Sequence, residues 1–132
     1  MKPIPVGTKG VFTLRVRPEH LASRFKDPIL PNVLATPVMI LAMENAALDA
    51  IRPFLDSSES AVGTAVSVRH LAATPLGHQV RAEAEVLQVD GRRIEFAVSA
   101  RDESEDIGRG THERMVVDVA RMHQRLAKKA PG

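Results

Sequence analysis

The chain has 132 residues, of which 44% are hydrophobic, and its 18 basic and 16 acidic residues give a net charge of +2. The small charge excess and the four Phe, without Trp or Tyr, argue against a nucleic-acid-binding surface. The absence of cysteine excludes a thiol nucleophile and a cysteine-ligated metal, and no hydrophobic run approaches the ~20 residues of a membrane span. We therefore expect one cytoplasmic domain, residues 1–132, that binds neither nucleic acid nor a membrane.

The first half of the sequence predicts a strand followed by a long helix. Hydrophobic residues alternate with polar ones at Phe12, Leu14 and Val16. This alternation is typical of a half-buried strand. A Pro-rich loop then leads to a helix expected over residues 37–52, with Thr36 as its N-cap and Pro53 ending it. Hydrophobic residues occupy nearly every face of this helix, so we expect the rest of the fold to enclose it.

The second half predicts four more strands, within residues 62–119. Runs of alternating hydrophobic and polar residues are separated by turn signals, and Asp90-Gly91 is a strong two-residue hairpin signal. Because the connections are short, we expect antiparallel pairing. The order of elements indicates an α+β fold in which a curved five-stranded antiparallel sheet wraps around one long central helix. Such a sheet leaves an edge to cover, which favours a homodimer that extends it.

Glu44 is the most informative residue, because it is a carboxylate in the middle of a hydrophobic helix. An unpaired charge in a dry core is costly, and a structural explanation is that Glu44 pairs with an arginine or with backbone donors. Two more residues suggest chemistry: Thr36, which could be a plain N-cap, and His70, which could be an ordinary core histidine. The strand pattern places His70 on one face with Val66 and Val68. A buried acid, an inward imidazole and a helix N-terminus together predict an acyl-transfer site.

No metal or cofactor motif accompanies these residues. The pair His112-Glu113 lacks the second histidine of an H-E-x-x-H site, and the five histidines are dispersed along the chain. The sequence also contains neither a Walker loop nor the glycine pattern of a dinucleotide-binding turn. We therefore expect no metal and no cofactor.

Several groups of residues carry, by their order and spacing, a resemblance to a known family. They are Val33-Leu34-Ala35-Thr36-Pro37 with Met43-Glu44, Gly63-Thr64-Ala65, Arg69-His70-Leu71-Ala72-Ala73-Thr74-Pro75, Asp90-Gly91-Arg92-Arg93 and Gly108-Arg109-Gly110-Thr111-His112-Glu113-Arg114. In this order they resemble the fluoroacetyl-coenzyme A thioesterase-like family of hotdog-fold proteins. The resemblance extends over about residues 6–121, which is most of the chain.

The resemblance implies a catalytic set of Thr36, Glu44 and His70. It also implies substrate contacts near Gly63 and Arg114, and an active site shared between the subunits of a dimer. The implied activity is that of an acyl-coenzyme A thioesterase, a hydrolase that cleaves a short-chain acyl thioester to the free acid and coenzyme A.

The resemblance leaves the acyl group open. The fluoroacetyl-specific member has aromatic side chains in the loop before the catalytic threonine, whereas residues 27–34 contain none here. Pro37 stands where that member has a small residue. An alternative to catalysis is a non-catalytic hotdog module that binds an acyl thioester or a related small metabolite. An acyl-coenzyme A hydrolysis assay separates the two.

Overall fold

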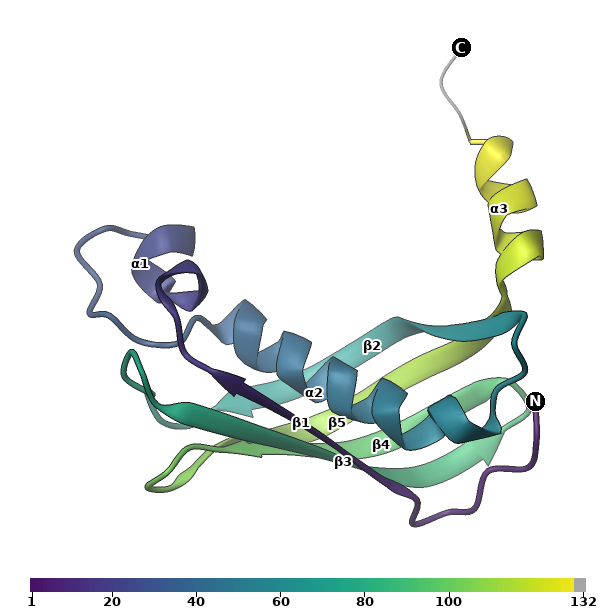
Figure 1. The fold of residues 1–132 in the computed structure, drawn as a ribbon, viewed down its shortest axis with the longest axis horizontal. Coiled ribbons are helices and arrows are strands. Elements are labelled where there is room, and N and C mark those ends of the chain that lie inside the picture. The colour runs from purple at the N-terminus through teal and green to yellow at the C-terminus, as the bar shows by residue number, and fades with distance from the viewer. Residues whose placement is uncertain (130–132) are drawn as a thin grey trace.

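The computed structural model of the protein describes residues 1–129. One antiparallel sheet with the strand order β1-β3-β4-β5-β2 curls along the helix α2 (Figure 1). The strands are β1 (Lys9–Arg15), β2 (Glu59–His70), β3 (Gln79–Asp90), β4 (Arg93–Arg101) and β5 (Asp106–Asp118). The helices are η1 (Pro18–His20), α1 (Ala22–Phe25), α2 (Thr36–Ile51), η2 (Arg52–Phe54) and α3 (Val119–Ala127). The predicted α+β fold, with five antiparallel strands and one long central helix, is confirmed.

The predicted hairpin joins β3 and β4. Asp90 pairs with Arg93, so the two loop residues are Gly91 and Arg92, one position later than the sequence signal suggested. Gly91 has a φ of 61°, a left-handed conformation that glycine adopts without steric cost.

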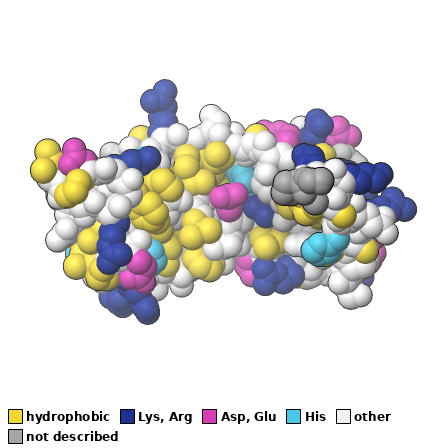
Figure 2. Space-filling model, turned by 90° about the horizontal axis from the view of Figure 1, so that it is seen from above, with side chains coloured by type: hydrophobic (Ala, Val, Ile, Leu, Met, Phe, Trp, Pro, Cys, Tyr) yellow, Lys and Arg dark blue, Asp and Glu magenta, His cyan; other side chains and the backbone are white. Residues whose placement is uncertain are grey.

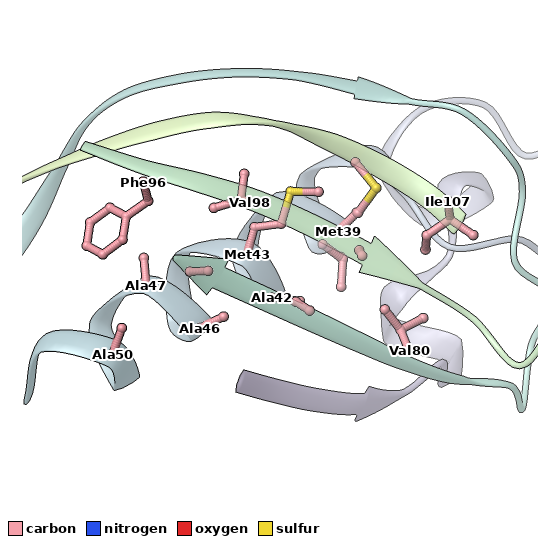
Figure 3. Packing of buried hydrophobic residues seen from close by; sticks show 14 of the residues in the cluster. Met39, Ala42, Met43, Ala46, Ala47, Ala50, Val80, Phe96, Val98 and Ile107 are labelled. Carbon is pink, nitrogen blue, oxygen red and sulfur yellow. The ribbon is translucent and has the colours of Figure 1, made fainter. Parts of the chain in front are cut away.

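The buried face of α2 carries four alanines and two methionines between Val38 and Ile51. In Figure 3 these side chains, Met39, Ala42, Met43, Ala46, Ala47 and Ala50, face Val80, Phe96, Val98 and Ile107 of the sheet. Gly10 in β1 allows the helix to come close, because a Cβ at this position would lie 2.8 Å from the Cα of Ala50. Small side chains therefore hold α2 tightly against the sheet and fix the direction of its opposite face.

The opposite face of α2 is not covered by the chain, which corrects the expectation that the fold encloses the helix. Leu41 is 50% exposed. The helix boundaries also differ from the prediction. Ala35 is the N-cap, Thr36 is already the first helical residue, and its hydroxyl makes no capping bond. The helix ends at Ile51, and the short helix η2 follows.

The basic C-terminal segment forms α3, which projects away from the sheet in Figure 1. The side chain of Asp118 accepts a hydrogen bond from the backbone N–H of Arg121 and so caps this helix. Within residues 1–129, no helix is both long and hydrophobic enough to cross a membrane.

The two edge strands of the sheet differ in how they are protected. β1 has 7 residues, and the backbone N–H of Val11 donates to the side chain of Asp49 on α2. β2 has 12 residues and pairs only with β5 within the described part of the chain. Val66, near the middle of β2, is 44% exposed. The longer edge is therefore the one left open.

Candidate active site

The first candidate pair joins the start of α2 to the end of β2. Thr36 Oγ1 lies 2.8 Å from His70 Nδ1, which is a hydrogen bond between residues 34 positions apart. Thr36 is the first residue of α2, where unpaired backbone amides carry partial positive charge. The structure thus brings two of the three predicted catalytic residues together at a helix N-terminus.

The surroundings of His70 keep its imidazole neutral. Burial lowers the pKa of His70 from its ordinary value of 6.5, and an interaction with the backbone of Ala72 opposes this to a smaller extent. Within residues 1–129, Nε2 of His70 is buried without a hydrogen-bond partner. At neutral pH the ring is therefore uncharged and able to accept a proton, as general base catalysis requires.

A hollow of about 450 Å³ lies beside this pair and is lined in part by Thr36 and His70. Most of its lining is hydrophobic, and Leu30, Val33 and Leu34 contribute to it. Figure 2, seen from the side on which α2 lies, shows hydrophobic side chains gathered over the end of the molecule that carries α1 and the start of α2. A mainly apolar hollow next to a polar pair suits a small organic group whose reactive end meets the pair.

The second candidate cluster surrounds Glu44 in the middle of α2. Glu44 Oε2 lies 3.7 Å from Nη1 of Arg114 on β5, and Nη2 of Arg114 donates to the carbonyl of Ala61 at 2.7 Å. Arg114 is buried, which lowers its pKa, whereas the carboxylate of Glu44 raises it. Glu44 therefore has an arginine partner, as one of the two explanations from the sequence predicted. This arginine lies on β5, on the sheet side of the carboxylate.

Gly63 provides the space in which Glu44 lies. A Cβ at this position would stand 2.7 Å from Glu44 Oε2 and 3.3 Å from Cε1 of His112. The β2–β5 register shifts between Gly63 and Ala65, so a β-bulge occurs at this point of the edge strand. A glycine beside a bulge is typical of a place where another group approaches the backbone closely.

His112 belongs to this cluster, although the sequence did not single it out as functional. It is 2% exposed, and its ring stacks on Phe96 with centroids 6.0 Å apart. Its Nδ1 lies 2.8 Å from the Ala65 carbonyl, and its Nε2 lies 3.2 Å from Nη1 of Arg114. Strand alternation could have identified it, because residues two positions apart in a strand lie on the same face. His112 therefore shares its face with Arg114.

The chain does not bring the two clusters together. Glu44 follows Thr36 by eight residues, or about 12 Å of helix rise, and no hydrogen bond or ion pair within residues 1–129 joins Glu44 to Thr36 or His70. The side chain of Glu44 is 36% exposed. The expectation that Glu44 is buried is therefore wrong for the single chain, because the helix face that carries it is uncovered.

The two clusters contain the parts of an acid–base site. They offer a neutral imidazole, a hydroxyl at a helix N-terminus and a carboxylate held by an arginine. Among residues 1–129, no group of three or more His, Asp or Glu side chains is placed to hold a metal ion. The arrangement can move protons and stabilise negative charge on an oxygen atom, which are the two requirements of acyl transfer.

Comparison with known proteins places the chain among thioesterases. Residues 16–120 match the family described as FlK, fluoroacetyl-CoA-specific thioesterase. The curated fluoroacetyl-CoA thioesterase of Streptantibioticus cattleyicolor is 43% identical over 101 residues, which cover 76% of this chain and 73% of that protein.

Solved structures show the same fold. The fluoroacetyl-CoA thioesterase FlK superposes with a TM-score of 0.92 and 35% identity over 98% of this chain and 100% of that chain. A variant of FlK in complex with acetyl-CoA gives a TM-score of 0.92 at 34% identity, covering 97% of this chain and 100% of that one. A Thermus thermophilus hypothetical protein of the thioesterase superfamily gives a TM-score of 0.87 at 34% identity. The match covers 98% of this chain and 97% of that chain. The expected hotdog fold is thereby confirmed.

Proposed function

Because the chain belongs to the family of fluoroacetyl-CoA-specific thioesterases, we propose that it is a hydrolase that cleaves a short-chain acyl-coenzyme A thioester to the free acid and coenzyme A. The observation that carries the proposal is the Thr36–His70 hydrogen bond at the N-terminus of α2, beside a mainly hydrophobic hollow. We place the activity in the cytoplasm, and the proposed chemistry uses only groups of the protein.

The first part of the proposed mechanism concerns the thioester carbonyl. A thioester has a good leaving group, so the main requirement is to stabilise the oxyanion that forms when the carbonyl is attacked. Backbone amides at the start of α2 are unpaired donors with partial positive charge, and they suit this oxygen. Thr36 orients the acyl group or the nucleophile from the same place. His70, which is neutral, can take a proton from water and then pass this proton to the departing thiolate.

The second part concerns the nucleophile. Glu44 either takes a proton from a water molecule that attacks the carbonyl carbon, or attacks that carbon itself. In the second route an acyl–glutamyl anhydride forms, the carbon–sulfur bond breaks, and water then hydrolyses the anhydride. Arg114 Nη1 lies 3.7 Å from Glu44 Oε2 and sets a positive charge beside the carboxylate that both routes use.

We propose that the complete site forms in a homodimer. An antiparallel pairing of two β2 strands about a two-fold axis between Val66 and Ser67 sets Gly63 of one chain opposite the partner's His70. The exposed Leu41 lies on α2 between Thr36 and Glu44, so this face of the helix is open to a partner subunit. The Glu44 cluster of one subunit would then adjoin the Thr36–His70 pair of the other, and the exposed helix face would be covered.

The dimer is expected to form through the open edge of β2. Sedimentation at micromolar concentration should give twice the mass of the chain, with an interface above the ~1,000 Å² of a stable complex. V66D should give monomers, because it buries a charge at the proposed axis. L87D is the matched control, since Leu87 is 42% exposed on β3, away from this edge. A monomeric wild-type protein, or equal behaviour of the two variants, would contradict this interface.

Hydrolysis is tested by the release of coenzyme A thiol from acetyl-, fluoroacetyl-, butyryl- and hexanoyl-coenzyme A. We expect at least one thioester to be turned over with a kcat/KM of about 10⁴ M⁻¹s⁻¹ or more, the ordinary range of enzymes. Calorimetric titration with the same thioesters measures binding, so that binding and hydrolysis can be compared for each thioester. Binding without thiol release would overturn the proposed hydrolysis and favour the non-catalytic binding module.

A further inference from the structure

His112 makes two hydrogen bonds that together define its protonation state. The carbonyl of Ala65 can only accept, so Nδ1, which lies 2.8 Å from it, carries a hydrogen. The guanidinium of Arg114 can only donate, so Nε2, which lies 3.2 Å from Nη1, must offer a lone pair. Only the neutral ring with hydrogen on Nδ1 makes both bonds. A protonated ring would direct an N–H at the guanidinium.

The surroundings favour this neutral form. Burial is the largest cause that lowers the pKa of His112, and the positive charge of Arg114 lowers it further. The bond to Ala65 and the negative charges of Glu44 and Glu113 act in the opposite direction. The net effect is a pKa below the ordinary value of 6.5.

Arg114 connects this ring to Glu44. Its Nη1 atom lies 3.2 Å from His112 Nε2 and 3.7 Å from Glu44 Oε2, and its Nη2 atom is bound to a carbonyl of β2. The Nε atom has no hydrogen-bond partner among residues 1–129. The orientation of the guanidinium therefore depends on two acceptors from the protein, a β2 carbonyl and the ring of His112, before Glu44 binds to it.

We propose that His112 is a positioning residue: its neutral ring fixes the Arg114 guanidinium, which in turn holds the Glu44 carboxylate in the space above Gly63. The expected effect on kcat rests on the proposed thioesterase activity. The neutral state of the ring rests on the geometry alone. Without the acceptor at Nε2, the Arg114 guanidinium loses one of the two protein acceptors that orient it and can turn about its remaining bond to Ala61. The carboxylate is then misplaced, and a displacement of about 1 Å can cost 10²-fold in rate.

Two substitutions separate the two bonds of the ring. Glutamine places its amide near the position of Nε2 and can accept from Arg114, whereas asparagine reaches only the position of Nδ1. We expect H112N to lower kcat about 10- to 100-fold with little change in KM, and H112Q to keep kcat within about threefold of wild type. H112F should resemble H112N, and H123Q on the exposed helix α3 is the control. Circular dichroism confirms that each variant folds.

A measurement on the wild-type protein tests the ring directly. Long-range ¹H–¹⁵N correlation spectra of histidine-labelled protein distinguish the two neutral tautomers and the protonated ring, and the missing signal in H112Q assigns His112. We expect the tautomer with hydrogen on Nδ1 at pH 7.

Each outcome decides one question. A ring protonated at pH 7, or with hydrogen on Nε2, would overturn the inference, as would H112N and H112Q with equal kcat. If the wild-type protein hydrolyses no thioester, the proposed function fails, and the spectra alone decide the state of His112.

Discussion

E44Q is expected to lower kcat on the best thioester by about 10²- to 10⁴-fold, the contribution of a positioned acid or base. Glutamine keeps the size of the side chain and leaves a carbonyl oxygen that can face Arg114, but it is neither a base nor a nucleophile at neutral pH. Because Glu44 is partly exposed and Arg114 keeps its bond to Ala61, the variant should fold. Steady-state kinetics, with circular dichroism as a check, provide the measurement.

The matched control for E44Q is E95Q, which removes an exposed carboxylate from β4. E95Q should keep the wild-type kcat. If E44Q also keeps it, Glu44 only neutralises Arg114, and the proposed nucleophile is wrong.

H70A should also lower kcat by about 10²- to 10⁴-fold, with a smaller effect on KM, because the ring transfers protons rather than binding the acyl group. H123A, at an exposed position of α3, is the control and should be neutral. An unchanged kcat in H70A would remove His70 from the mechanism. If both H70A and E44Q kept the wild-type kcat, the non-catalytic binding module would be favoured.

The pH dependence of the wild-type enzyme has a defined direction. The pKa of His70 is lowered in the folded protein, so the ring stays neutral at pH 7 and gains its proton only below the ordinary value of 6.5. Activity should therefore fall as the pH drops through this lowered pKa. The free energy of unfolding should also decrease as the pH falls. The reason is that His70 binds a proton more readily in the unfolded chain, where its pKa is not lowered. A kcat that rises on acidification from pH 7 would contradict a neutral His70.

A mixture of E44Q and H70A tests whether the site is shared. If Glu44 of one subunit works with His70 of the other, each mixed dimer contains one intact site, and random exchange gives about a quarter of wild-type activity. If each subunit contains a complete site, the mixture stays inactive. Subunit exchange is promoted by brief incubation in dilute solution before the assay.

Element types were predictable from the sequence because local patterns determine them. The alternation in β1, β3 and β4, the Asp90-Gly91 signal and the long hydrophobic helix are all patterns among residues that are close in the sequence. Thr36 shows the limit of such patterns. The sequence predicted a helix cap, but its hydroxyl bonds to His70, 34 residues away, and Ala35 takes the cap position. No local pattern reports a contact at that distance.

The candidate site was predictable only where local sequence patterns mark its residues. The hydrophobic surroundings of Glu44 in the sequence marked it as unusual, but they predicted full burial, because the exposed helix face depends on which side the sheet covers. The roles of Arg114 and His112 depend on the β2–β5 register and on the bulge between Gly63 and Ala65. A shift of one residue in that register would turn both side chains to the other face.

The bond from Val11 to Asp49 bears on how far assembly can proceed. A sheet with two open edges can add copies at both ends, and such head-to-tail growth produces filaments. Here the side chain of Asp49 occupies a backbone donor of β1, so a further strand would have to displace it. In the proposed dimer, pairing through β2 about a two-fold axis would use the open β2 edge of both subunits at once. In that dimer, Asp49 on the central helix would help to keep the assembly finite, because it blocks a donor on the remaining edge strand.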